Sequence, residues 1–172
     1  METDFQRLEK KRRFRYAAGY VVQQEGTEPV ERLIRNGETT RFGVRQSLAP
    51  NQNLNDLGRD DAEDILKKRV WDFYGYDEIE ALTVPAKIFD SHILFNFTVA
   101  SENAREALGL DPEGGLDRTA RKEIEAARSQ DFFSSYTTLL EQHAREAHGG
   151  REAIIRRANR IPPRNVNAQT TG

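Results

Sequence analysis

The most apolar stretch of the chain, residues 83–100, constrains its fold more than any other segment. It reads TVPAKIFDSHILFNFTVA, in a chain of 172 residues of which only 37% are hydrophobic and 31% are charged. A chain this polar has few side chains from which to build a core, so its richest apolar segment has to lie at the centre. Pro85 is tolerated in the first turn of a helix. We therefore predict a central buried helix over 83–100.

The flanking segments show the three- and four-residue apolar spacing of amphipathic helices. The first is 5–25, which Gly26 and Pro29 bring to an end. Further helices are predicted over about 60–74, 101–109, 119–128, 129–147 and 151–160. The length suits one domain, which we divide into a main region 1–110, a helical segment 111–160 packed on it, and a flexible tail 161–172.

Residues 30–44, VERLIRNGETTRFGV, interrupt the helical pattern and predict a β-hairpin. Asn36-Gly37 favours a two-residue turn, which would place Arg35 opposite Glu38. A two-stranded ribbon is unstable by itself, so it has to lean on the helices. The predicted fold class is mostly α (α+β), with one small hairpin near the N-terminus.

Composition excludes several function classes. Cysteine is absent, and His92, His143 and His148 lack metalloenzyme spacing, so we expect no metal and no cofactor. The net charge of -2 gives no field that would recruit nucleic acid. The chain shows neither an apolar signal region nor a bilayer-spanning segment, so we expect synthesis in the cytoplasm and no transmembrane helix.

The junction of the first helix and the hairpin carries the candidate chemistry. Glycoside hydrolysis needs a protonated carboxylic acid and a second group that stabilises positive charge or activates water. Glu25 stands at the helix end, where apolar neighbours and the helix dipole both favour a protonated carboxyl group. The hairpin offers Glu38, Thr39 and Thr40 across the gap. A solvated helix-end glutamate and a plain hairpin threonine would give the same pattern, so the pattern alone leaves both interpretations open.

Two motifs at this junction, YVVQQEG and NGETTRFGV, resemble the phage-type N-acetylmuramidases of glycoside hydrolase family 108. Members of that family have a helix ending in Glu-Gly-Gly, followed by a Gly-Gly-x-Thr-x-Tyr/Phe-Gly-Ile segment. The positions that match are Glu25, Gly26, Gly37, Thr40, Phe42, Gly43 and Val44. The later segments DDAEDILKKRVWDFYGYDEI, KIFDSHILFNFTVASENA and GGLDRTARKEIEAA keep the family's order, so the resemblance covers about residues 10–160.

The resemblance implies a lysozyme-like muramidase region over 1–110 and a peptidoglycan-binding helical segment over 111–160. It implies cleavage of the glycan strands of the bacterial cell wall, with Glu25 as general acid, Thr40 orienting water and Glu38 as a possible second carboxylate. Phe42 and Trp71 would then line the sugar cleft, although a lone tryptophan is more often core packing. Asp90, inside an apolar helix, is interpreted as a structural hydrogen-bonding hub, because a buried aspartate needs partners.

A non-enzymatic role stays open beside this hypothesis. A degenerate muramidase could serve as a peptidoglycan-binding or structural part of a phage particle or of an injection or secretion device, and a helical adaptor without glycan contact is a third possibility. An endolysin released by a holin, or a domain delivered by a phage tail or secretion machinery, would reach the periplasm and cell wall without a signal peptide. These routes make peptidoglycan the expected partner.

Overall fold

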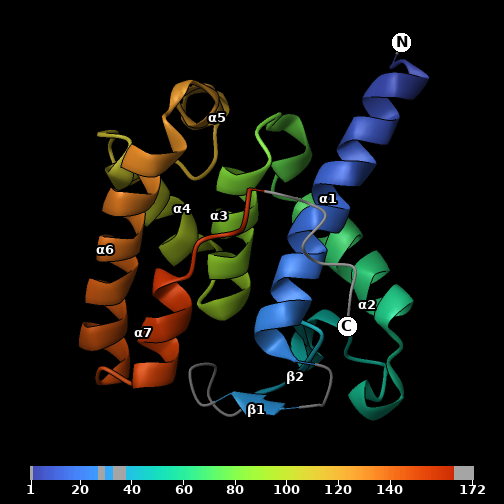
Figure 1. Ribbon diagram of the computed structural model, residues 1–172. Coiled ribbons are helices and arrows are strands. Elements are labelled where there is room, and N and C mark those ends of the chain that lie inside the picture. Colours follow the sequence, from blue (N-terminus) through green and yellow to red (C-terminus); the bar gives the residue numbers. More distant parts are fainter. Residues whose placement is uncertain (1, 27–29, 33–37, 165–172) are drawn as a thin grey trace.

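The computed structural model describes residues 2–26, 30–32 and 38–164 (Figure 1). Helices dominate these residues and one small antiparallel sheet accompanies them, which confirms the predicted mostly α (α+β) class. The helices are α1 (Asp4–Glu25), α2 (Arg59–Leu66), α3 (Thr83–Leu94), α4 (Phe97–Ala107), α5 (Arg118–Ala126), α6 (Ser129–His148) and α7 (Glu152–Asn159). The strands are β1 (Val30–Arg32), β2 (Glu38–Arg41) and β3 (Val44–Arg45). Single helical turns are η2 (Gln46–Leu48), η3 (Leu54–Asp56) and η5 (Tyr76–Glu78), and η4 (Lys67–Trp71) is a π-helical turn that continues α2.

Helix α1 runs from an exposed N-terminal end to the sheet (Figure 1). A capping box starts it, in which the Thr3 hydroxyl accepts a hydrogen bond from the Gln6 amide and the Gln6 side chain binds the Thr3 amide. Its buried residues begin at Phe14 and continue to Glu25. Gly26 ends it with φ 79°, in the region that glycine adopts readily, so the chain turns off toward the strands at this point.

The central apolar stretch is buried as predicted, but it forms two helices and not one. Every residue of α3 from Val84 to Leu94 is buried. The helix stops at Phe95, and the Asn96 side chain accepts a hydrogen bond from the Val99 amide at 2.9 Å, which caps the start of α4. Asparagine is a preferred N-cap, and this local capping outweighs the continuous apolar pattern on which the prediction of one helix rested.

Trp71, expected in the sugar cleft, lies in the core with 1% of its surface exposed. Its ring contacts Phe14, Tyr76 and Phe89 at centroid distances of 5.7, 5.2 and 5.2 Å. Gly58 is the N-cap of the preceding helix α2, which continues into the π-helical turn that contains Trp71. The prediction that Trp71 faces a cleft is therefore wrong, because the ring fills the space between α1 and α3 and offers no face to a sugar.

The sheet has the order β1-β2-β3, so the predicted ribbon gains a third short strand. Glu38 pairs with Arg32 and Thr40 pairs with Val30. The register thus places Arg32 opposite Glu38, where the prediction had Arg35, and Arg35 itself lies outside the described residues. The predicted turn at Asn36-Gly37 falls outside the described residues.

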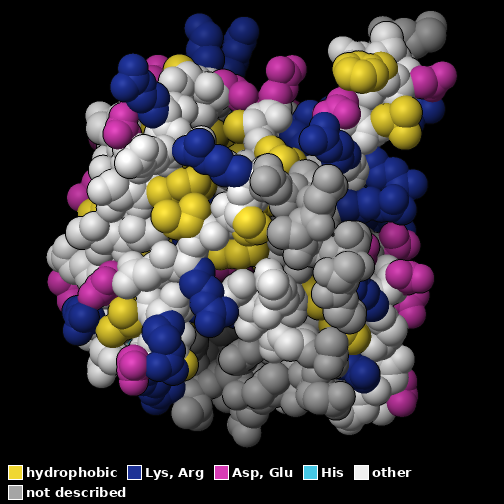
Figure 2. Space-filling view, in the orientation of Figure 1, with side chains coloured by type: hydrophobic (Ala, Val, Ile, Leu, Met, Phe, Trp, Pro, Cys, Tyr) yellow, Lys and Arg dark blue, Asp and Glu magenta, His cyan; other side chains and the backbone are white. Residues whose placement is uncertain are grey.

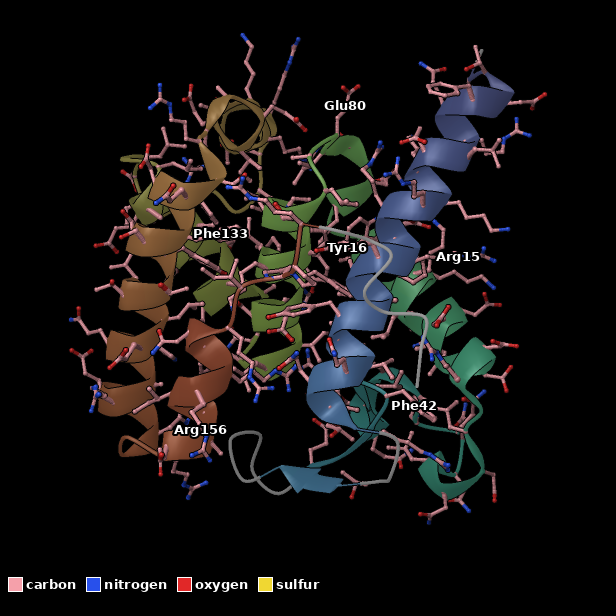
Figure 3. All side chains as sticks on the ribbon, in the orientation of Figure 1. Arg15, Tyr16, Phe42, Glu80, Phe133 and Arg156 are labelled. Atoms are coloured by element: carbon pink, nitrogen blue, oxygen red, sulfur yellow. The ribbon has the colours of Figure 1, made fainter. Side chains whose placement is uncertain are left out.

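The chain after α7 returns along α1, so the predicted flexible tail is bound at its beginning (Figures 1 and 3). The Tyr16 hydroxyl donates a hydrogen bond to the Pro163 carbonyl, and the Tyr20 hydroxyl donates to the Arg160 carbonyl at 3.1 Å. Two buried tyrosines of α1 therefore hold residues 160–163 in place. Residues 165–172 fall outside the described part of the chain.

One apolar core connects the whole described chain, with members from Phe14 in α1 to Ala158 in α7. Helix α3 packs against α1, α4 and α6, and α7 packs against α6. On the face shown in Figure 2, acidic and basic side chains are interspersed, with hydrophobic side chains in small patches between them. The predicted boundary between 1–110 and 111–160 therefore lies within a continuous core. That these two regions differ in function stays a prediction.

Candidate functional site

Glu25 and Thr40, predicted to face each other, do so. Glu25 is the last residue of α1 and only 7% of it is exposed, while Thr40 on β2 is 3% exposed. The Thr40 hydroxyl donates a hydrogen bond to the Glu25 Oε2 atom at 3.2 Å. Gly26 ends α1 at positive φ, and Thr40 on β2, 15 residues after Glu25, lies against the end of that helix.

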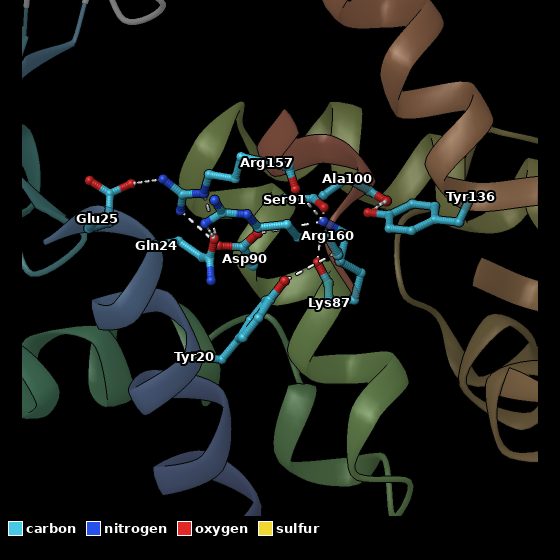
Figure 4. A network of polar contacts seen from close by, with 10 residues as sticks. All are labelled: Tyr20, Gln24, Glu25, Lys87, Asp90, Ser91, Ala100, Tyr136, Arg157 and Arg160. Atoms are coloured by element: carbon cyan, nitrogen blue, oxygen red, sulfur yellow. Dashed lines mark hydrogen bonds and ion pairs between the residues drawn. The ribbon is translucent and has the colours of Figure 1, made fainter. Parts of the chain in front are cut away.

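Arg157 of α7 binds the other oxygen of Glu25. Its Nη1 atom donates to Glu25 Oε1, while Nε and Nη2 donate to Asp90 Oδ1 at 3.1 and 2.8 Å (Figure 4). The guanidinium thus bridges two carboxylates, one from α1 and one from α3. Burial alone would lower the pKa of Arg157, but the charges of Asp90 and Glu25 outweigh it and raise that pKa above its usual value, so Arg157 stays charged.

Lys87 completes the charge cluster from one turn earlier on α3. Its ammonium lies 3.7 Å from Asp90 Oδ2 and donates a hydrogen bond to the Arg157 carbonyl at 3.0 Å. Lys87 and Asp90 are both 0% exposed. Burial lowers the pKa of Lys87 to about 8, and the charge of Asp90 opposes this shift only in part. Glu25, Arg157, Asp90 and Lys87 are called the buried charge network below.

Hydrogen bonds to backbone carbonyls fix the surroundings of this network (Figure 4). The Ser91 hydroxyl donates to the Lys87 carbonyl at 2.9 Å, and the Tyr136 hydroxyl of α6 donates to the Ala100 carbonyl at 3.2 Å. At the outer edge Arg160 donates to the Gln24 side chain at 2.7 Å. Asp90 itself links α3 to α7 through Arg157, so it is the hydrogen-bonding hub between helices that its position in an apolar helix predicted.

The other sequence-predicted residues are placed differently. The Glu38 carboxylate accepts a hydrogen bond from the Ser47 amide at 2.5 Å, which ties β2 to η2. Phe42 is 7% exposed, has φ 52°, and carries the Arg41 guanidinium 5.2 Å from its ring centre (Figure 3). Phe42 thus belongs to the core beneath the end of α1.

Sequence reasoning missed Arg157 and Lys87, and each had a detectable signal. Arg157 lies three residues after Ile154 and directly before Ala158, so it shares the inward-facing stripe of α7. Lys87 lies inside the apolar run, three residues before Asp90. A basic residue on an apolar face requires a buried carboxylate partner, and Asp90 was the residue in need of one.

The described residues line surface depressions that lie away from this network. One of about 640 Å³ lies beside the N-terminal half of α1 and is lined by charged residues, among them Glu9, Lys10, Arg13 and Asp77. Within the described ranges no group of His, Asp and Glu side chains could hold a metal ion. No helix among the described residues is both long and apolar enough to cross a membrane.

Comparisons with known proteins add evidence on the fold. No family model matches the chain, and no curated protein matches it. Among solved structures, the structure of Brucella abortus SagA is similar, with a TM-score of 0.64 and 16% sequence identity. The similarity covers 86% of this chain and 92% of that one. At this identity it shows that the chain shares its fold with SagA over most of both chains.

Proposed function

We propose that this chain cleaves the glycan strands of peptidoglycan, with Glu25 as the general acid. The observation that carries the proposal is the close approach of Glu25 at the end of α1 to Thr40 on β2, at 3.2 Å. A buried ionisable group with specific polar partners is a candidate for chemistry, and Glu25 is such a group.

The reaction assigns one role to each group. Glu25 donates its proton to the glycosidic oxygen as the bond from that oxygen to the sugar carbon breaks, and a water molecule forms the new bond to that carbon. Thr40 orients the water from the side of the sheet. The proton that water loses goes to a carboxylate, for which Glu38 is the candidate because residues 38 and 40 share one face of β2.

Arg157 sets a condition on this mechanism. Its positive charge stabilises the ionised form of Glu25, whereas proton donation requires the neutral form. The same observation favours a second candidate function, in which the buried ion pair is purely structural and the chain is a degenerate muramidase that binds peptidoglycan within a phage particle or delivery device. Under either function the chain acts at the cell wall after release or delivery.

Digestion of purified peptidoglycan distinguishes the two functions. Wild type and Glu25→Gln are compared by release of reducing sugar ends and by mass spectrometry of the fragments. Glu152→Gln is the matched control, because Glu152 also pairs with an arginine of α7 but its side chain is 81% exposed. Hydrolysis by wild type and by the control, with loss in Glu25→Gln, supports the enzyme. Wall binding without fragment release by wild type supports the degenerate protein.

A further inference from the structure

The guanidinium of Arg157 is shared unequally between its two carboxylates. Asp90 receives two of its hydrogen bonds, from Nε and Nη2, and Glu25 receives the one from Nη1. Asp90 is 0% exposed and Glu25 is 7% exposed, so water screens neither interaction well. The negative charge of Asp90, on the other side of the guanidinium, therefore weakens the attraction between Arg157 and Glu25.

We propose that Asp90 controls the protonation of Glu25 through the shared Arg157, which makes Asp90 a positioning residue for the general acid. This inference rests on the role proposed for Glu25. A guanidinium paired with Glu25 alone would hold it ionised, since an opposite charge at hydrogen-bonding distance favours the charged form. Asp90 offsets that charge and leaves Glu25 able to take up a proton while Arg157 still fixes its orientation.

Lys87 acts on the same balance with the opposite sign. Its ammonium, 3.7 Å from Asp90 Oδ2, partly neutralises Asp90 and so returns positive charge to the network. With Lys87 charged the four groups sum to zero, and with Lys87 neutral they sum to -1. Glu25 should therefore take up a proton more readily when the charge on Lys87 is lost.

Other described groups near the network can be placed in the same way. Burial is the largest cause that raises the pKa of Tyr20 from α1 and of Tyr136 from α6, and the charge of Asp90 adds to it, so both phenols stay neutral. Arg160 after α7 binds Gln24 at the exposed edge. Thr40, from β2, contributes a neutral hydroxyl.

The test follows Glu25 itself and not catalysis. The side-chain carboxyl carbon of Glu25 is titrated by NMR in ¹³C-labelled protein, and its signal is assigned by its loss in Glu25→Gln. The variants are Asp90→Asn, Lys87→Met and the control Asp77→Asn. Asp77 pairs with Lys10 at 3.3 Å near the other end of α1, about 22 Å away along the helix, so its change removes one carboxylate charge outside the network.

Asp90→Asn should move the midpoint of Glu25 protonation to lower pH by roughly one unit, because a like charge is removed. Lys87→Met should move it to higher pH, and Asp77→Asn should leave it in place. If Asp90→Asn fails to fold, the test depends on Lys87→Met, in which the midpoint of Glu25 protonation should move to higher pH. Midpoints that stay unchanged, or that move in the same direction in both network variants, overturn the inference.

The titration and the wall assay separate this inference from the proposed function. If wild type releases no wall fragments but Glu25 responds to both variants in the expected directions, the coupling stands and the hydrolase proposal fails. If wild type digests the wall and Glu25 does not respond to either variant, the hydrolase proposal stands and the coupling is wrong. Where both hold, the basic limb of the pH–rate profile shifts with the NMR midpoint, because the general acid must be protonated to act.

Discussion

Replacement of Arg157 by methionine is the most direct test of the buried charge network. Methionine is unbranched and uncharged and replaces the aliphatic part of the side chain, so Glu25 and Asp90 stay buried without the guanidinium that binds both. Removing one partner from a buried ion pair costs about 3–5 kcal/mol. Most single domains unfold at a cost of about 5–15 kcal/mol, so a large share of the stability is at risk. For a chain of this length we expect the unfolding midpoint to fall by roughly 6–20 °C.

The cost should depend on pH, with a sign that follows from the carboxylates. Without Arg157, burial favours the protonated forms of Glu25 and Asp90, so the folded variant binds more protons than its unfolded chain above about pH 4, the usual range of these groups. A state that binds more protons loses stability as pH rises. The deficit of Arg157→Met relative to wild type should therefore be smallest near pH 4 and grow toward pH 7.

Arg156→Met is the control for this experiment. Arg156 is the neighbouring residue on α7, and it pairs with Glu152 at 2.7 Å on the exposed surface, with side chains 60% and 81% exposed. Such a pair contributes about 0.3–0.5 kcal/mol. Chemical denaturation of wild type and both variants at several pH values measures the difference. The reasoning is refuted if Arg157→Met costs no more than Arg156→Met, or if its cost is the same at pH 4 and pH 7.

Three further predictions concern other parts of the chain. Gly43→Ala should destabilise the protein by about 2–4 kcal/mol and detach the sheet from α1, because the added Cβ atom would lie 2.7 Å from the Val21 side chain at φ +83°. In the same denaturation assay Gly109→Ala should cost only about 1 kcal/mol, because Gly109 also has a positive φ but lies in open space. Burial lowers the pKa of Lys87 from 10.5 to about 8, so between these two pH values the unfolded chain binds the proton more tightly than the folded protein. The free energy of unfolding of wild type should therefore rise by roughly 3 kcal/mol relative to Lys87→Met between pH 8 and 10.5. Parallel curves of stability against pH for the two proteins would contradict this. A fragment of residues 1–109 should aggregate, since it exposes the α3 and α4 surfaces that α6 covers, and a sharp unfolding transition near that of the intact chain would contradict a single core.

Local sequence signals predicted most of the elements but not how they pair. The helices at 118–126, 129–148 and 152–159 begin and end within about two residues of their predicted bounds, because glycines and breaks in apolar spacing mark their ends. The predictions that failed each depended on a competition between two local preferences. Asn96 caps a new helix inside an apolar run, and Glu38 pairs with Arg32 although the Asn-Gly pattern favoured Arg35 as its partner.

The site was predicted only as far as sequence proximity extends. Glu25 and Thr40 are 15 residues apart in the sequence, whereas Arg157 is 132 residues from Glu25. Periodicity places Arg157 on the buried face of α7, but it does not state which helix that face meets. The missing step is a matching of buried charges: an inward arginine on α7 and an inward aspartate on α3 each require a partner of opposite sign. Because the cluster also contains Lys87, two cations share Asp90, and a second acid balances their charge. Glu25, at the buried end of α1, is the acid that the fold supplies.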